Sequence, residues 1–303
     1  MYKKIVYKIR NEVSLNTRQL PFLCTQGEVN YQIARKRHFD NLPIISDYEQ
    51  SLIDALRTEG VAMTSLQALS IPTTELMLQA AKNLIPKIPQ SISQNKNEYV
   101  VHATPQQILE NKEIFLWGLE QRLINIIENY IGLPVAYHGA YFRRDNINPV
   151  QTKSRLWHID PEDRKVLKVV VYLNDVSENS GAFEYIPLPL NSEIISSLKY
   201  THGYIQDKTM EKYISPSHFK SCTGIAGTVI LAATGGIFHR GKIPVSSDRY
   251  TVFFDYTSRK PIVHNHYGAS FLNDEQLQLL AKNLTPQQRE CVFWKDNFWQ
   301  MLR

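Results

Sequence analysis

The chain has 303 residues, of which 43% are hydrophobic and 21% charged, and 34 Lys and Arg against 29 Asp and Glu give a formal net charge of +5. This length and composition suit a sizeable buried core, and we expect a single domain over residues 1–303. The modest positive charge lacks basic tracts interleaved with aromatic residues, so nucleic acid is not expected as a partner.

The cysteines and the apolar runs indicate the compartment. Cys24, Cys222 and Cys291 show no CxxC spacing, which argues against a disulfide framework or a thiolate zinc site. Charges interrupt every apolar run near the N-terminus, and no run approaches the roughly 18 apolar residues of a membrane span. We therefore expect a cytoplasmic protein with no membrane partner. The sequence leaves the oligomeric state open.

Residues 1–134 are expected to be mainly helical, although the first 45 show no clear pattern. Apolar residues at helical spacing predict helices over 46–60 and 74–84 and a helical region over 104–132. Capping residues bound two of these segments. They are Ser46 with Glu49, Thr104 with Pro105 and Gln107, and the closing glycines Gly60 and Gly132.

After Pro134 the pattern becomes strand-like, with short β-branched or aromatic runs bounded by turn residues. These runs are 135–142, 166–173, 182–186, 228–232 and 250–256. We expect them to form an antiparallel barrel or sandwich over residues 135–257, interrupted by a polar, irregular insertion at 190–226. Two capped helices, opening at Asn273 and Thr285, are expected in residues 258–303. The fold class is therefore expected to be α+β.

A possible metal site begins in the segment RLWHID. His158 and Asp160 are two residues apart, so on an extended strand their side chains point to the same face. Iron(II) with open coordination positions prefers two His and one carboxylate. The pair alone is a weak signal, because His-x-Asp pairs also arise by chance. Downstream, His239 follows the Gly235–Gly236 turn, and Arg249 comes ten residues later at the head of a strand.

Four segments together resemble the phytanoyl-CoA dioxygenase-like branch of the Fe(II)/2-oxoglutarate-dependent oxygenases. They are HID, KVVVYLNDVSENSGAFEYIP, GTVILAATGGIFHRG and DRYTVFFDY. The resemblance implies a double-stranded β-helix, a jelly-roll or cupin-type barrel, flanked by the N-terminal and C-terminal helices. It implies that His158, Asp160 and His239 bind the iron and that Arg249 pairs with the distal carboxylate of 2-oxoglutarate. After YIP, where the family continues with Gly-Ser-His, this chain has Leu188, Pro189 and Leu190.

We expect an Fe(II)/2-oxoglutarate-dependent dioxygenase that consumes O2 and releases succinate and CO2. The expected reaction is hydroxylation of an unactivated C–H of a small or carrier-linked organic molecule, for example in specialised metabolism. Asp160 argues against halogenation, because the related halogenases replace this carboxylate with Gly or Ala. Desaturation and cyclisation by the same centre stay open. So do a cupin-type metalloenzyme that does not use 2-oxoglutarate and a non-catalytic binding protein on this scaffold.

The alternation of side chains along a strand points to further residues that could bind the co-substrate. Thr251 lies two residues after Arg249, so on a strand both side chains point to the same face. The Thr251 hydroxyl is therefore expected to reach the same carboxylate. Lys168 and Tyr172 share one face of the strand at 166–173, opposite an apolar face. If that face lines the barrel, Lys168 is expected to contact 2-oxoglutarate and Tyr172 the substrate. If it faces solvent, both are ordinary surface residues.

Further substrate contacts are expected from Trp157, Phe183 and Arg155, although aromatic residues in strands are more often part of a core. Basic residues near the first ligand strand either bind an anionic group or form a solvated rim. They are Arg143, Arg144, Lys153, Arg155, Arg164 and Lys165. His264 and His266 form a rival His-x-His pair in an expected loop without a partnered carboxylate, which disfavours them as ligands.

Overall fold

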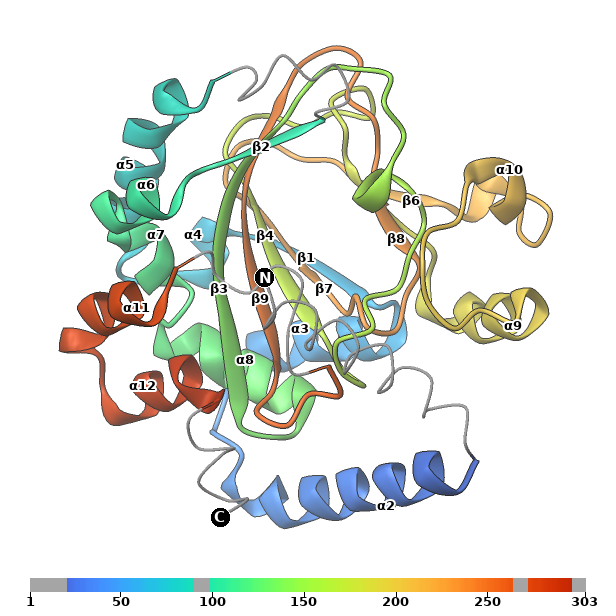
Figure 1. Ribbon diagram of the computed structural model, residues 1–303, viewed down its shortest axis with the longest axis horizontal. Coiled ribbons are helices and arrows are strands. Elements are labelled where there is room, and N and C mark those ends of the chain that lie inside the picture. Colours follow the sequence, from blue (N-terminus) through green and yellow to red (C-terminus); the bar gives the residue numbers. More distant parts are fainter. Residues whose placement is uncertain (1–20, 90–98, 264–271, 296–303) are drawn as a thin grey trace, which may run out of the picture.

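The computed structural model describes residues 21–89, 99–263 and 272–295, and it contains two antiparallel sheets with helices around them (Figure 1). The larger sheet has six strands in the order β1-β7-β4-β9-β3-β2, and the smaller has three in the order β6-β5-β8. In chain order the strands are β1 Val61–Ser65, β2 Val100–His102, β3 Val135–Asp145, β4 Leu167–Tyr172, β5 Phe183–Tyr185, β6 Lys220–Cys222, β7 Thr228–Ala232, β8 His239–Gly241 and β9 Arg249–Ser258. Mixed helices and antiparallel sheets agree with the expected α+β class.

Most helices come before β3 or after β9. They are α2 Pro21–His38, α3 Asp47–Thr58, α4 Leu66–Leu69, α5 Thr74–Leu84, α6 Pro105–Glu110, α7 Lys112–Trp117, α8 Gln121–Ile131, α9 Leu188–Leu198, α10 Asp207–Met210, α11 Asp274–Leu280 and α12 Pro286–Val292. Short 3-10 turns are η1 Phe39–Asn41, η2 Ile85–Lys87, η3 Lys153–Arg155, η4 Pro216–His218 and η5 Ala281–Asn283. Every helix within the described ranges is too short or too polar to cross a lipid bilayer.

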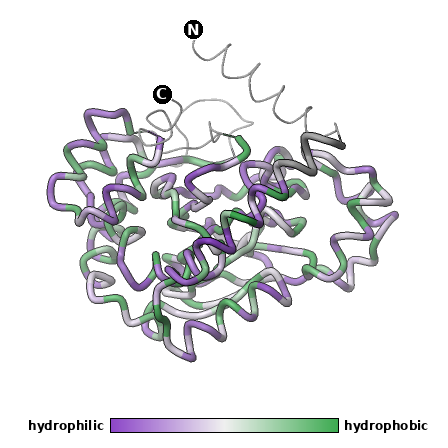
Figure 2. The backbone as a smooth tube through the Cα atoms, turned by 90° about the horizontal axis from the view of Figure 1, so that it is seen from below, coloured by the Kyte–Doolittle hydropathy of each residue, from purple (hydrophilic) through white to green (hydrophobic). Residues whose placement is uncertain are grey.

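The six-stranded sheet has one face toward the helices and one toward the smaller sheet. Alternate residues of β4 and β9 pack with α3, α5, α7 and α8 in the main apolar core; they are Leu167, Val169, Val171, Val252, Phe254 and Tyr256. On the opposite face, Val170 and Tyr172 of β4 pack with Phe183 and Tyr185 of β5. Figure 2 shows the resulting alternation of apolar and polar segments along the chain. The sheet therefore separates a helical core from a second region, which contains the candidate site.

The helices α3, α6, α11 and α12 begin at the predicted capping residues. Ser46 and Thr104 each form a complete capping box with the residue three positions later, and Asn273 and Thr285 do the same for α11 and α12. Gly60 has a φ of 85°, a left-handed conformation that glycine adopts without steric cost. The helix predicted over 74–84 is confirmed as α5. The region at 104–132 is divided into α6, α7 and α8.

The predicted strands are confirmed as β3, β4, β5, β7 and β9, with small differences at their ends, but β1, β2, β6 and β8 were not predicted. The expectation of an irregular insertion at 190–226 is wrong. This segment contains most of α9, then α10 and β6, and β6 pairs with β5. Asn191 stabilises the start of α9, because its amide donates to the carbonyl oxygens of Ile186 and Pro187 and accepts from Phe238 N. Such tertiary hydrogen bonds leave no periodic signal in the sequence.

Candidate metal centre

The backbone places the three candidate ligands beside one another. His158 pairs with His239, the first residue of β8, through two backbone hydrogen bonds of 3.1 and 3.0 Å. Asp160 N donates to Thr234 O at 3.0 Å. These bonds hold the segment of His158 and Asp160 against the chain on both sides of the Gly235–Gly236 turn. Two stretches far apart in sequence therefore meet at one point.

The donor atoms of this triad fit a single metal ion. His158 Nε2 lies 3.8 Å from Asp160 Oδ1, and His239 Nε2 lies 3.7 Å from Asp160 Oδ2. Candidate donor atoms of all three residues lie within 4.8 Å of one another, and the imidazole centroids are 4.2 Å apart. Each side chain is buried. Two imidazoles and one carboxylate in this arrangement match the set that mononuclear iron(II) sites use.

Backbone carbonyls set the orientation of both imidazoles. His158 Nδ1 lies 2.8 Å from Leu156 O, and His239 Nδ1 lies 3.1 Å from Ile237 O. A carbonyl only accepts, so each neutral ring carries its proton on Nδ1 and presents the Nε2 lone pair to the triad. The carbonyl two residues before each histidine thus selects the tautomer that a metal requires.

The protonation states also suit a metal. Burial lowers the pKa of His239 to about 3, assisted by electrostatic repulsion from His158 and Lys168. Burial likewise lowers the pKa of His158. Burial alone would raise the pKa of Asp160, but Lys168 and the two histidines bring it well below its usual range. Near neutral pH the triad is therefore two neutral imidazoles and a carboxylate, the forms that bind metals.

Lys168 of β4 lines the cavity, and its Nζ is 2.8 Å from Asp160 Oδ2. Burial would lower the pKa of Lys168, but Asp160, Asp255 and Glu162 raise it well above its usual value. Lys168 is therefore charged. In this arrangement Lys168 forms an ion pair with Asp160 through Oδ2, the carboxylate oxygen that also faces His239.

A cavity of about 630 Å³ opens beside the triad. Its wall includes the basic residues Arg143 and Arg249 and the acidic residues Glu162 and Asp255. Tyr204, which is 54% exposed, also lines it, and its ring lies 5.1 Å from that of His158. The segment between α9 and α10 therefore reaches the cavity beside the triad.

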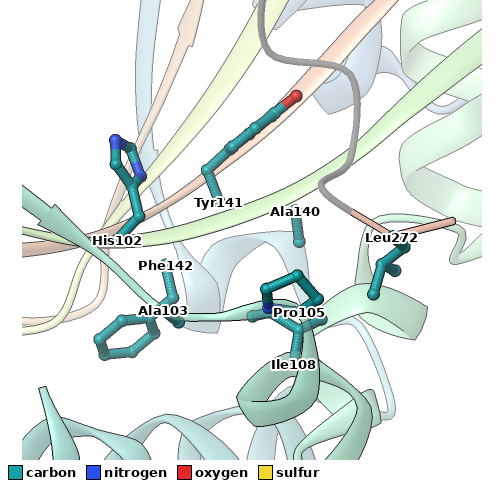
Figure 3. Close-up of a pocket in the computed structure, with 8 residues that line it drawn as sticks. All are labelled: His102, Ala103, Pro105, Ile108, Ala140, Tyr141, Phe142 and Leu272. Atoms are coloured by element: carbon teal, nitrogen blue, oxygen red, sulfur yellow. The ribbon is translucent and has the colours of Figure 1, made fainter. Parts of the chain in front are cut away.

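A much smaller cavity of about 10 Å³, roughly room for one water molecule, lies next to it (Figure 3). His102 and Tyr141 line both cavities, and the apolar side chains of Pro105, Ile108 and Phe142 line only the small one. Its size and apolar wall make the small cavity a packing feature, whereas the larger one has the volume and the polar groups of a binding site.

Arg249 lies on the cavity wall and is only 1% exposed. Its Nη1 donates to Gly181 O, and its Nη2 donates to Asp145 Oδ2 at 3.0 Å. Thr251 shares its strand face. Within the described part of the chain, the Thr251 hydroxyl oxygen is buried without a hydrogen-bond partner. A buried hydroxyl without a partner is costly, and Thr251 itself does not line the cavity.

The four residues expected at the substrate occupy different positions. Phe183 lines the cavity and stacks on His239 at 5.5 Å between ring centroids. Tyr172 does not line it; its hydroxyl donates to Cys222 O and accepts from Phe183 N. Trp157 is fully buried beneath the guanidinium of Arg240, 4.4 Å from its ring. Tyr172 and Trp157 thus support the site from within the core.

Arg155 also lies away from the cavity. Its guanidinium donates to backbone carbonyl oxygens that belong to Tyr99, Asn146, Asn148 and Val150. It therefore holds the loop after β3. The other basic residues near the first ligand strand do not form one cluster. Arg143 and Lys153 line the cavity. Arg144 pairs with Asp248, Arg164 pairs with Glu28, and Lys165 donates to Tyr130 O. His264 and His266 lie outside the described residues.

Asp145 and Asp255 did not emerge from the sequence. Asp255 lies on the same face of β9 as Arg249 and Thr251, because these positions are separated by even numbers of residues. The alternation of side chains along a strand, which selected Thr251, would also have selected Asp255. Asp145 lies on β3 directly opposite Arg249, and only the register of the two strands shows that pairing.

No protein-family model matches the sequence, and no curated protein matches it. Solved structures align with low identity. HygX from Streptomyces hygroscopicus, solved with nickel, 2-oxoglutarate and hygromycin B, is 13% identical, and the alignment covers 69% of this chain and 87% of HygX at a TM-score of 0.45. EctD from S. alaskensis, solved with 2-oxoglutarate and 5-hydroxyectoine, is 18% identical, with 71% and 76% covered and a TM-score of 0.46.

SnoK from nogalamycin biosynthesis, described as a non-heme alpha ketoglutarate dependent carbocyclase, is 14% identical, with 72% of this chain and 85% of SnoK covered and a TM-score of 0.49. Identities and TM-scores this low do not assign an activity. The function must be argued from the site.

Proposed function

We propose that this chain is a single-domain Fe(II)/2-oxoglutarate-dependent dioxygenase. His158, Asp160 and His239 bind the iron in this proposal, and Arg249 and Thr251 bind the distal carboxylate of 2-oxoglutarate. The observation that carries it is the meeting of three buried metal donors with a buried arginine at one cavity. We further propose that the two sheets form a double-stranded β-helix, with the triad between them.

The donor set accounts for the choice of metal and co-substrate. Two imidazoles and one carboxylate fill one side of an octahedral ion and leave positions for further ligands. When bound, iron and 2-oxoglutarate supply the oxidising chemistry, with O2 consumed and succinate and CO2 released as the substrate is oxidised. Arg249 is permanently charged and planar, which suits a carboxylate better than a lysine would.

The protein's own residues position and shield the reaction. The carbonyls of Leu156 and Ile237 keep both Nε2 atoms directed at the triad. Phe183 and Phe253 supply apolar wall, and Tyr204 lies near His158. We propose hydroxylation of a small or carrier-linked organic molecule, with desaturation and cyclisation as variants of the same chemistry.

The test uses metal-free protein in anaerobic buffer. Fe(II) followed by 2-oxoglutarate is expected to produce a visible charge-transfer absorption band, and admitting O2 is expected to release succinate. Arg249→Ala should weaken 2-oxoglutarate binding by at least about tenfold, since a charge-assisted hydrogen bond is lost, while Fe(II) binding is unchanged. Metal-dependent oxidation without succinate would instead indicate a cupin-type enzyme that does not use 2-oxoglutarate.

A further inference from the structure

A buried carboxylate joins two arginines at one end of the cavity. Asp145 is the last residue of β3 and is 1% exposed. Arg143 donates to it from Nε at 2.9 Å and from Nη2 at 2.6 Å, and Arg249 donates from Nη2 at 3.0 Å and from Nε at 3.3 Å. Both arginines line the cavity, whereas Asp145 is not part of its wall. Asp145 therefore acts on a bound molecule without touching it, through the two arginines and the net charge they share.

The strand register produces this arrangement. Asp145 lies directly opposite Arg249 in the β3–β9 pair, and Arg143 lies opposite Thr251. Residues two apart on a strand share a face, so all four side chains belong to one face of the sheet. The hydroxyl of Thr251, buried without a partner in the described chain, belongs to the same group.

Asp145 fixes the orientation of Arg249. A guanidinium has five N–H groups in a rigid plane. Asp145 accepts from two Arg249 nitrogens, and Gly181 O accepts from the third, Nη1. These bonds use three of the five N–H groups, and Arg249 also forms a hydrogen bond with the hydroxyl of Tyr172. Because the guanidinium is planar, fixing one edge also fixes the direction of the remaining N–H groups.

Asp145 also sets the charge. Arg143 and Arg249 share this carboxylate, so these three side chains together have one net positive charge. Arg155 and Asp255, which carry opposite charges, also act on them. Burial alone would raise the pKa of Asp145, but the two arginines bring it well below its usual range, so it is ionised. One positive charge matches the one carboxylate at the distal end of 2-oxoglutarate. A 2-oxo acid that ends in an alkyl group would leave this charge unmatched in a buried place, which is unfavourable.

We propose that Asp145 is a positioning residue that aligns Arg249 and restricts the co-substrate to 2-oxo acids with a second carboxylate. This inference rests on the proposed function. It assigns to Asp145 a role in co-substrate selection, exerted through the arginines and without contact to the reacting atoms.

The experiment measures binding to Fe(II)-loaded protein without O2. Calorimetry gives the Kd of 2-oxoglutarate and of 2-oxopentanoate, which has the same five carbons but lacks the distal carboxylate. The wild type is expected to prefer 2-oxoglutarate by at least about a hundredfold. Asp145→Asn is expected to weaken 2-oxoglutarate binding about tenfold or more and to change the Kd of 2-oxopentanoate less than twofold. Asp145→Glu, which keeps the charge, should recover part of the preference.

Asp248→Asn is the matched control. Asp248 accepts from Arg144 Nε at 2.7 Å, so it forms a comparable Arg–Asp pair near the same strand ends, but neither residue lines the cavity. This variant should leave both Kd values unchanged. If Asp145→Asn does not fold, Arg143→Gln tests the charge match, because the cluster then becomes neutral and the preference for 2-oxoglutarate should fall.

The outcomes separate this inference from the proposed function. A wild type that binds neither 2-oxo acid contradicts the proposed function and the inference with it. A wild type that prefers 2-oxoglutarate, with the same preference in Asp145→Asn, contradicts the inference alone. An equal loss of both 2-oxo acids in Asp145→Asn, or an unchanged preference in Arg143→Gln, would mean that the cluster is only structural and would also overturn it.

Discussion

The charge and tautomer of His158 and His239 depend on the groups around each ring. A solvent-exposed histidine titrates near pH 6.5 and exchanges its proton between two nitrogens. In this protein burial lowers both pKa values, and two backbone carbonyls hold the proton on Nδ1. The residue type was evident from the sequence, but the tautomer and the charge state follow from the packing around each ring.

Asp160→Ala separates metal binding from folding. We expect Fe(II) affinity to fall by more than about a hundredfold, since losing a ligand costs more than losing a group that only orients one. The metal-free variant should still fold. Its free energy of unfolding should fall by about 1–3 kcal/mol, because Lys168 loses a partner 2.8 Å away. Metal analysis and urea denaturation check both effects.

The double variant Asp160→Ala/Lys168→Met serves as the control for that prediction. Removing the lysine as well takes away the unpaired charge, so stability should recover while metal binding stays lost. Near-normal Fe(II) binding by Asp160→Ala would contradict the ligand assignment.

His102 should make stability depend on pH in the acid range. Burial and the nearby charge of Arg143 lower its pKa to about 4, against about 6.5 when unfolded. Between these values the unfolded chain binds more protons than the folded one, so stability falls as the pH drops from 6.5 toward 4. The contribution is at most about 1.4 kcal/mol per pH unit. Urea unfolding at pH 6.5 and pH 5, with a chelator present, should show a smaller loss for His102→Gln than for the wild type.

At the scale of elements, local signals placed the helix ends well. Capping boxes at Ser46, Thr104, Asn273 and Thr285 use side chains within three residues of the backbone they satisfy, so the sequence contains the whole interaction. β1 and β2 were missed for the opposite reason. β1 pairs with β7, more than 150 residues later, and such pairing has no local signature.

Gly60 links a helix end to the metal centre. Its φ is 85°, and an added Cβ would collide with Ile237 Cγ2, in the residue whose carbonyl orients His239. We expect Gly60→Ala to destabilise the protein by about 2–4 kcal/mol through backbone strain and overpacking and to weaken Fe(II) binding. Thermal unfolding and metal titration measure the two effects.

Gly203→Ala is the control for the steric part. Gly203 also has a positive φ, of 103°, but an added Cβ would meet nothing within 4 Å. This variant should lose only the strain of about 1–2 kcal/mol. Equal losses in both variants would show that Gly60 is needed for its backbone conformation alone.

At the scale of the whole molecule, the candidate site requires the complete fold. His158 and Asp160 precede β4, His239 begins β8, and Arg249 begins β9, so the ligands assemble only when both sheets are formed. Metal and 2-oxoglutarate should then bind the folded state and have little affinity for the unfolded chain. At a hundred times the Kd, binding stabilises by about 2.7 kcal/mol, which should raise the Tm by about 5 °C. Asp160→Ala should show no such shift, and a shift with 2-oxoglutarate in the absence of metal would contradict the proposed site.

The sequence by itself determined the α+β class and the capped ends of the helices that it predicted, because these depend on local periodicity and capping. Its His-x-Asp spacing pointed to His158 and Asp160, and the family resemblance added His239. Only the tertiary structure decided which polar residues face the cavity. It brought Phe183 to His239, directed Arg155 and Tyr172 to backbone partners, and set Asp145 against Arg249. The physical reason is that strand register and long-range pairing depend on the whole sheet, so neither can be read from neighbouring residues.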